Sequence, residues 1–254
     1  MKINGINTIN ITKLNRINIA NVNKLNRITI GGAPPVPISL DDRTRTALLN
    51  TSFITGTPFT INLPPTAVEG DLVFIFIASD NVVGSPMFEV PTGWTEHFSA
   101  YGTIPDNTIQ LWSKILSLND ENAGTVSVYP LITSNRDMQC WSMIGTGIDT
   151  SNPVSNVGTK VESQGTTMTI PAITPTYDGL AVGFWGYDGG DGEPTTITSG
   201  WTKLEESDAD PSFSGLLSGF GSKDSTAGVS TGNLAVTFLL SDGFGGVIVN
   251  FKAA

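Results

Sequence analysis

The residues of this chain that could do chemistry are few, and the densest group is acidic. The loop at residues 188–193 places Asp188, Asp191 and Glu193 among three glycines. Oxygen-rich loops of this kind can hold Ca²⁺, although the twelve-residue calcium-loop pattern is absent. Gly and Asp are also ordinary turn residues, so a solvated turn between strands is the simpler interpretation. We therefore expect no metal site and keep Asp188 and Asp191 as candidate ligand contacts.

Aromatic side chains offer a second kind of site. Trp185 and Tyr187 lie directly before the acidic loop, and aromatic faces are platforms for sugar rings. These two residues complete the set of candidate ligand contacts. Trp94 and Trp201 each follow a glycine at equivalent places in the chain, and this equivalence predicts a shared packing role in a core.

Catalytic groups are harder to assemble. A Ser-His-Asp arrangement would have to use His97, the single histidine, and no Gly-x-Ser-x-Gly elbow accompanies it. Alternation with Phe98 predicts that His97 points away from the core. A glycan depolymerase stays open as an alternative, because carboxylate pairs for glycoside cleavage leave no local signature. We expect no catalytic residue, no cofactor and no enzymatic activity.

Composition indicates which elements must position these side chains. The 254 residues include 28 Gly and 15 Pro, with 39% hydrophobic and 14% charged residues, which is typical of short strands joined by turns. The single Cys140 excludes an internal disulfide and is predicted to be a buried thiol. The first half of the body predicts strands over 59–63, 72–78, 94–101, 109–116, 125–131 and 138–144. We predict an all-β protein with a β-sandwich or jelly-roll-like body.

An eleven-residue repeat opens the chain. Lys2, Lys13 and Lys24 each begin the same Asn- and Ile-containing phrase, in which apolar and polar side chains alternate. A right-handed helical supercoil can share this period, but Asn and β-branched Ile favour a short β-ribbon. One ribbon cannot bury its own apolar face, so it needs sister subunits or a docking protein. We predict an attachment segment over residues 1–31 and a Gly/Pro-rich linker over 32–50.

Charge is divided between the two ends of the chain. Residues 1–31 carry five bases and no acid, a net +5, whereas the remainder holds all 23 acids and eight bases, a net −15. The five bases are spread among apolar residues, and the acidic body would repel phosphate, so we expect no nucleic-acid partner. The N-terminus does not resemble a signal peptide, and the longest apolar run is too short to cross a bilayer, which predicts a soluble protein without membrane insertion.

The body contains two diverged copies of one pattern, predicted over about 51–156 and 157–254. Four landmarks recur in the same order at offsets of 107 to 109 residues. They are Phe59-Thr60-Ile61 and Met168-Thr169-Ile170, Gly70-Asp71-Leu72 and Asp178-Gly179-Leu180, Gly93-Trp94-Thr95 and Gly200-Trp201-Thr202, and Ser113-Lys114 and Ser222-Lys223.

These landmarks also carry a family resemblance. The motifs are Gly70-Asp71-Leu72, Pro91-Thr92-Gly93-Trp94-Thr95, Leu111-Trp112-Ser113-Lys114, Gly147-Ile148-Asp149 and Asn152-Pro153-Val154. Together with the Asn/Ile opening, they resemble β-rich domains of phage virion proteins, especially tail and fibre components. The resemblance implies a virion structural protein, located in the phage particle, that contacts other virion proteins through its N-terminal segment. A homo-oligomer, with a trimer favoured, is expected. A capsid decoration or head fibre protein and a receptor module for host surface glycans are the alternatives.

Overall fold

The computed structural model describes residues 2–3, 6–7, 36–80, 87–101, 107–131, 133–188, 196–208 and 216–254. The chain divides into two compact units, Met1–Val36 and Pro37–Ala254. In the first unit, strand β1 (Lys2–Ile3) pairs antiparallel with β2 (Ile6–Asn7), so the opening of the repeat is a short β-ribbon. The repeat positions Lys13 and Lys24 lie outside the described residues.

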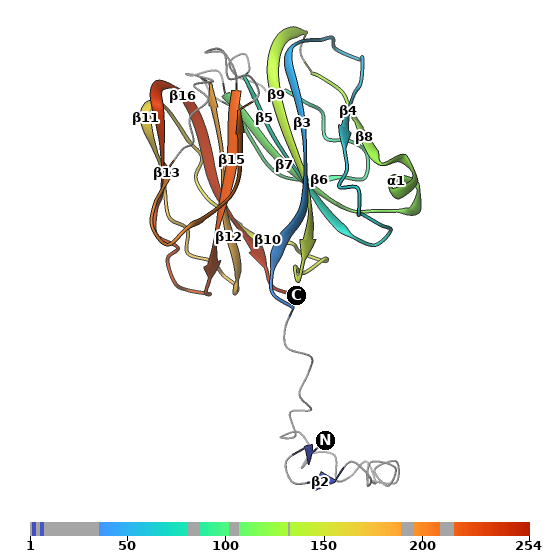
Figure 1. Ribbon diagram of the computed structural model, residues 1–254, viewed down its shortest axis with the longest axis vertical. Coiled ribbons are helices and arrows are strands. Elements are labelled where there is room, and N and C mark those ends of the chain that lie inside the picture. The colour runs from blue at the N-terminus through green and yellow to red at the C-terminus, as the bar shows by residue number, and fades with distance from the viewer. Residues whose placement is uncertain are drawn as a thin grey trace. The chain divides into compact units, whose positions relative to one another are not determined.

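The second unit, called the body below, begins with a five-stranded antiparallel sheet in the order β3-β9-β5-β7-β6 (Figure 1). Its strands are β3 (Ser39–Phe53), β5 (Leu72–Asp80), β6 (Thr95–Tyr101), β7 (Asn107–Ile115) and β9 (Ser134–Thr146). The strand pair β4 (Phe59–Asn62) and β8 (Thr125–Val128) forms a further layer, and helix α1 (Leu118–Ala123) connects β7 to β8.

The second half of the body repeats this order with a larger sheet. Its main path is β10-β16-β12-β15-β14, which matches the first sheet strand for strand. The strands on this path are β10 (Val154–Val157), β12 (Gly179–Asp188), β14 (Thr202–Asp208), β15 (Leu216–Ser225) and β16 (Leu234–Lys252). Two further strands, β11 (Val161–Ile170) and β13 (Thr196–Ile197), pair with β16. The predicted duplication is therefore present as a repeated topology.

Three apolar clusters hold the body together. Strand β5 contributes to two of these clusters. Phe74 and Phe76 face the cluster between the two sheets, whereas Val73 and Ile75 face the cluster beneath β4 and β8. A strand buried on both faces is a continuous apolar run rather than an alternating one. The third cluster lies on the outer face of β12 and is enclosed by β11 and β16. Each half thus has its own core, and a shared core joins the halves.

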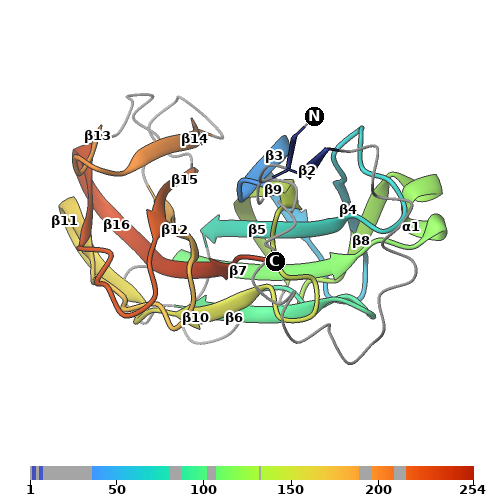
Figure 2. The same ribbon diagram turned by 90° about the horizontal axis from the view of Figure 1, so that it is seen from below.

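The two sheets also approach each other along their edges. Strand β6 of the first half lies beside β10 of the second (Figure 2). At another edge, Arg43 Nε of β3 donates to Glu205 Oε1 of β14 at 2.8 Å. Charged side chains on edge strands discourage pairing with further strands.

One predicted boundary is wrong. Strand β3 begins at Ser39, so the linker predicted over 32–50 ends before that residue. The strand was hidden because Asp42 has a positive φ of 49° and a register shift between Asp41 and Thr44 interrupts the alternation. The second sheet begins at Val154, close to the boundary between the halves predicted at about 156–157.

Helix α1 is also absent from the predicted elements. Ser117 and Asp120 form a capping box, and Gly124 ends the helix in the left-handed conformation with φ of 62°. Six residues are too few to establish a helical period. Within the described ranges, no helix has the length and apolar character that crossing a membrane requires.

Candidate functional site

The structure places the predicted aromatic ligand contacts in the core, and the prediction is wrong for both. Trp185 and Tyr187 are fully buried in the third cluster, where the Tyr187 and Phe238 rings stack with centroids 4.1 Å apart. Phe184 points to the opposite face of β12, into the shared core. Because β12 is covered on both faces, neither aromatic side chain can serve as a surface platform for a sugar.

The structure describes only part of the acidic loop. Asp188 ends β12 and is half-buried, whereas Asp191 lies outside the described residues. No group of three or more His, Cys, Asp or Glu side chains that could hold a metal ion occurs among the described residues.

The packing role predicted for the paired tryptophans is confirmed. Trp94 and Trp201 are 9% and 8% exposed and belong to the cores of the first and second halves. Cys140 is likewise buried, and burial raises the pKa of its thiol well above the usual value.

His97 does not point away from the core as predicted. A β-bulge between Glu96 and Phe98 breaks the alternation, so the His97 ring lies 6.2 Å from the Phe74 ring of the shared core. The His97 Nε2 atom lies 2.7 Å from Ser113 Oγ. Burial lowers the pKa of His97 to about 4, so the imidazole is neutral at pH 7.

The second half supplies an internal control for this Ser-His pair. The same bulge recurs between Lys203 and Glu205, where the bulged residue is Leu204, which packs against the shared core. Ser222 stands at the place of Ser113. The serine therefore recurs at this position without a histidine beside it, and its presence alone does not indicate a Ser-His pair with a chemical role.

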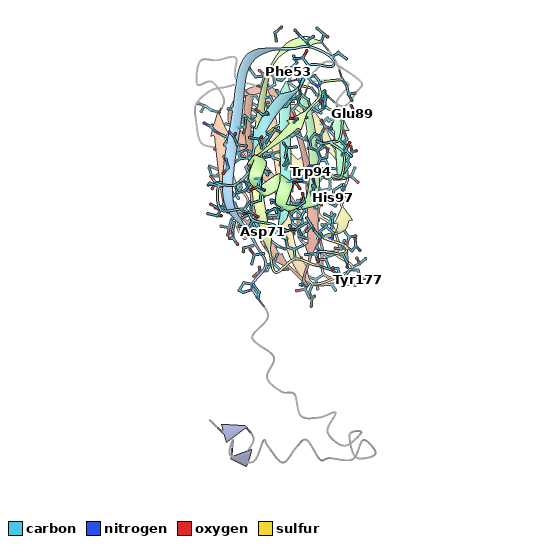
Figure 3. All side chains as sticks on the ribbon, turned by 90° about the vertical axis from the view of Figure 1, so that its right-hand side faces the viewer. Phe53, Asp71, Glu89, Trp94, His97 and Tyr177 are labelled. Carbon is cyan, nitrogen blue, oxygen red and sulfur yellow. The ribbon has the colours of Figure 1, made fainter. Side chains whose placement is uncertain are left out.

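Polar and aromatic groups converge at a different place, which we call the Tyr129 groove. It is a cavity of about 350 Å³ on the face where Figure 3 shows Glu89 and Trp94. The groove is lined by residues 89–94, which come from one part of the chain, and by residues from 114–129, which come from another. Its principal lining residues are Glu89, Thr92, Trp94, Lys114, Asp120 and Tyr129.

Backbone pairing and an ion pair fix the geometry of the Tyr129 groove. The Glu89 N–H donates to the Tyr129 carbonyl at 3.0 Å, which sets the two residues side by side. Lys114 Nζ donates to Asp120 Oδ1 at 2.7 Å. Burial raises the pKa of Asp120, but hydrogen bonds from Lys114 and Ser117 outweigh it and hold that pKa below its usual range.

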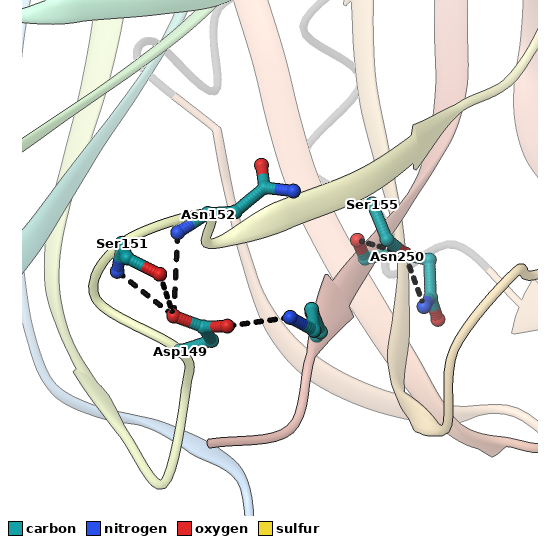
Figure 4. A network of polar contacts seen from close by, with 6 residues as sticks. Asp149, Ser151, Asn152, Ser155 and Asn250 are labelled. Carbon is teal, nitrogen blue, oxygen red and sulfur yellow. Dashed lines mark hydrogen bonds and ion pairs between the residues drawn. The ribbon is translucent and has the colours of Figure 1, made fainter.

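A second polar network secures the connector between the halves (Figure 4). Asp149 Oδ2 accepts from Lys252 Nζ at 2.6 Å, and its Oδ1 accepts from the Ser151 N–H at 2.9 Å and hydroxyl at 2.6 Å. The bond from Lys252 is the main reason that the pKa of Asp149 lies below its usual range. Asn250 Nδ2 donates to Ser155 Oγ at 2.8 Å nearby. These contacts tie the connector to the C-terminal strand and have a structural purpose.

Comparisons of the chain with protein-family models, curated proteins and solved structures find no match.

Sequence reasoning found the groove only in part. Trp94 and Lys114 were singled out as landmarks of the duplication, but Glu89, Asp120 and Tyr129 were not. A comparison of the two halves can identify these residues. Where the two copies of one fold carry different side chains at equivalent positions, the packing of that fold does not require a particular one.

Proposed function

We propose that this protein is a phage structural protein, most simply a tail fibre or other tail-attached component. In this proposal the N-terminal segment anchors the molecule to the virion and the β body projects from it. The observation that carries the proposal is the division of the chain into Met1–Val36, with five bases and no acid, and the strongly acidic body Pro37–Ala254. Opposite charges suit two units with different partners.

The edges of the body support an attachment role for the other unit. Strands β3 and β14 each pair with one neighbour within the described part of the sheets, and both carry several charged side chains, including Asp41 and Glu205. Such edges resist the addition of strands from another chain. Assembly is therefore better assigned to the N-terminal repeat, which we propose joins sister subunits, with a trimer favoured.

Imaging of phage particles tests the anchoring. Deletion of residues 1–31 should remove the body from the particle, and the double variant Lys13→Glu/Lys24→Glu should lower its occupancy. The control variant Lys203→Glu reverses a positive charge on the body instead of the N-terminal segment. It should leave occupancy unchanged. If the deleted protein still attaches, the proposal is wrong. The position of the body in the wild-type images separates a tail component from a capsid decoration protein.

A further inference from the structure

We propose that the Tyr129 groove is a binding site for an uncharged saccharide. A sugar ring has apolar C–H faces and a rim of hydroxyl groups, each of which donates and accepts hydrogen bonds. The groove offers a surface for both parts. Tyr129 is 43% exposed beside the cavity and supplies an amphipathic aromatic face.

The polar lining suits the hydroxyl rim. The carboxylates of Glu89 and Asp120 accept hydrogen bonds, and Lys114 and the Thr92 hydroxyl donate them. The ion pair between Lys114 and Asp120 fixes two of these groups before a ligand arrives. A volume of about 350 Å³ falls within the range of small-molecule sites.

The second half of the body shows that packing does not demand this lining. Thr196 pairs with Thr237 there, at the places that Glu89 and Tyr129 occupy in the first half. The fold is kept although threonines replace both the acid and the aromatic residue. The side chains of Glu89 and Tyr129 are therefore not required by the packing of this fold.

The contacts of an equivalent pair of lysines also differ between the halves. Lys114 and Lys223 are equivalent landmarks, but Lys223 Nζ donates to the Thr231 carbonyl at 2.8 Å instead of meeting a carboxylate. Asp120 belongs to α1, and β15 of the second half is followed by a turn at 226–229 in place of that helix. The first half thus gathers an acid, an ion pair and an exposed aromatic residue around one cavity, and the described residues at the equivalent positions of the second half do not.

Electrostatics decides the class of saccharide. The groove contains two carboxylates, and the sequence after residue 31 has a net charge of −15. Sugars that carry carboxylate or phosphate groups would be repelled. An uncharged saccharide meets no such barrier. This inference concerns the body alone, so it can fail while the anchoring proposal holds, and the reverse is also true.

Binding is measured on the full chain with a defined panel of probes: glucose, galactose, mannose, N-acetylglucosamine, lactose, maltose and chitobiose. Saturation-transfer NMR and calorimetry identify binding, and an array of neutral oligosaccharides extends the panel to larger ligands. We expect at least one neutral sugar to bind with a Kd of about 1 mM or tighter. The variant Tyr129→Thr, which copies Thr237 of the second half, should weaken that binding at least about tenfold.

Two further variants sharpen the test. Glu89→Gln keeps the size of the side chain and should weaken binding by about threefold, because it removes a charged acceptor. Tyr177→Ala removes an aromatic residue that is 49% exposed elsewhere on the body and should leave binding unchanged. The proposal is overturned if no neutral sugar binds, if Tyr129→Thr binds as well as the wild type, or if 3′-sialyllactose binds more tightly than lactose.

Discussion

The two halves of the body share a strand order and a β-bulge, yet they fill their cores differently. Trp112 of β7 is fully buried in the core of the first half, whereas Gly221 stands at the same place on β15. A Cβ atom at Gly221 would lie 3.2 Å from Ile197 Cδ1 of β13. In the second half, Ile197 of β13 therefore lies against the position that carries the indole side chain in the first half.

This difference shows that the duplicated fold holds the strand order constant but not the side chains that fill its cores. Positions outside the cores also differ, and there the first half has Asp120 and Tyr129. The comparison thus separates side chains that recur in both halves from side chains that one half carries.

The largest expected effect concerns the paired tryptophans. Trp94→Ala and Trp201→Ala should each lower the free energy of unfolding by about 3–5 kcal/mol, because each substitution empties a space inside a core. Denaturant unfolding measures both losses. Leu239→Ala, at a side chain that is 62% exposed, serves as the control and should cost less than about 0.5 kcal/mol. Losses that differ more than twofold between the two tryptophans would contradict their equivalence.

The second prediction uses His97 and Leu204. The folded state holds His97 neutral with a pKa of about 4, against an ordinary value of 6.5. Between these values the unfolded chain binds a proton that the folded chain does not, so stability falls as the pH drops from 6.5 to 4. The loss from this residue is at most about 3 kcal/mol, from 1.36 kcal/mol per pKa unit.

The variant His97→Leu copies the second half and should remove that contribution. Unfolding is measured at several pH values for both proteins, and the difference between them isolates the histidine from the carboxylates. We expect the stability difference to grow in favour of the variant as the pH falls. A difference that stays constant from pH 7 to pH 4 would mean that the His97 ring is solvated.

The smallest effect concerns a contact between the halves. Trp141 Nε1 donates to Ser218 Oγ at 3.0 Å, and Ser218 Oγ donates to Gln139 Oε1 at 3.0 Å, all within the buried interface. Ser218→Ala leaves the indole N–H without this acceptor and should cost about 1–2 kcal/mol. Ser52→Ala, at an exposed serine of β3, is the matched control. Equal thermal stability of the two variants would show that this chain of hydrogen bonds contributes nothing.

Much of the fold follows from local pattern. The all-β class, the strands β4 to β9 within a few residues, and the duplication could be predicted, because strand period and turn residues are properties of neighbouring positions. The packing roles of Trp94 and Trp201 followed from their recurrence. Strand β3 was missed because a bulge and edge charges disguise its alternation.

The sequence by itself determined which strands have alternating side chains and which are continuously apolar. It did not determine which other elements cover each face of a strand. Trp185 and Tyr187 are buried because β11 and β16, which come from other parts of the chain, enclose the outer face of β12. The Tyr129 groove exists because segments that are separate in sequence meet at one place. Burial and convergence depend on long-range pairing, and only the tertiary structure decides that pairing.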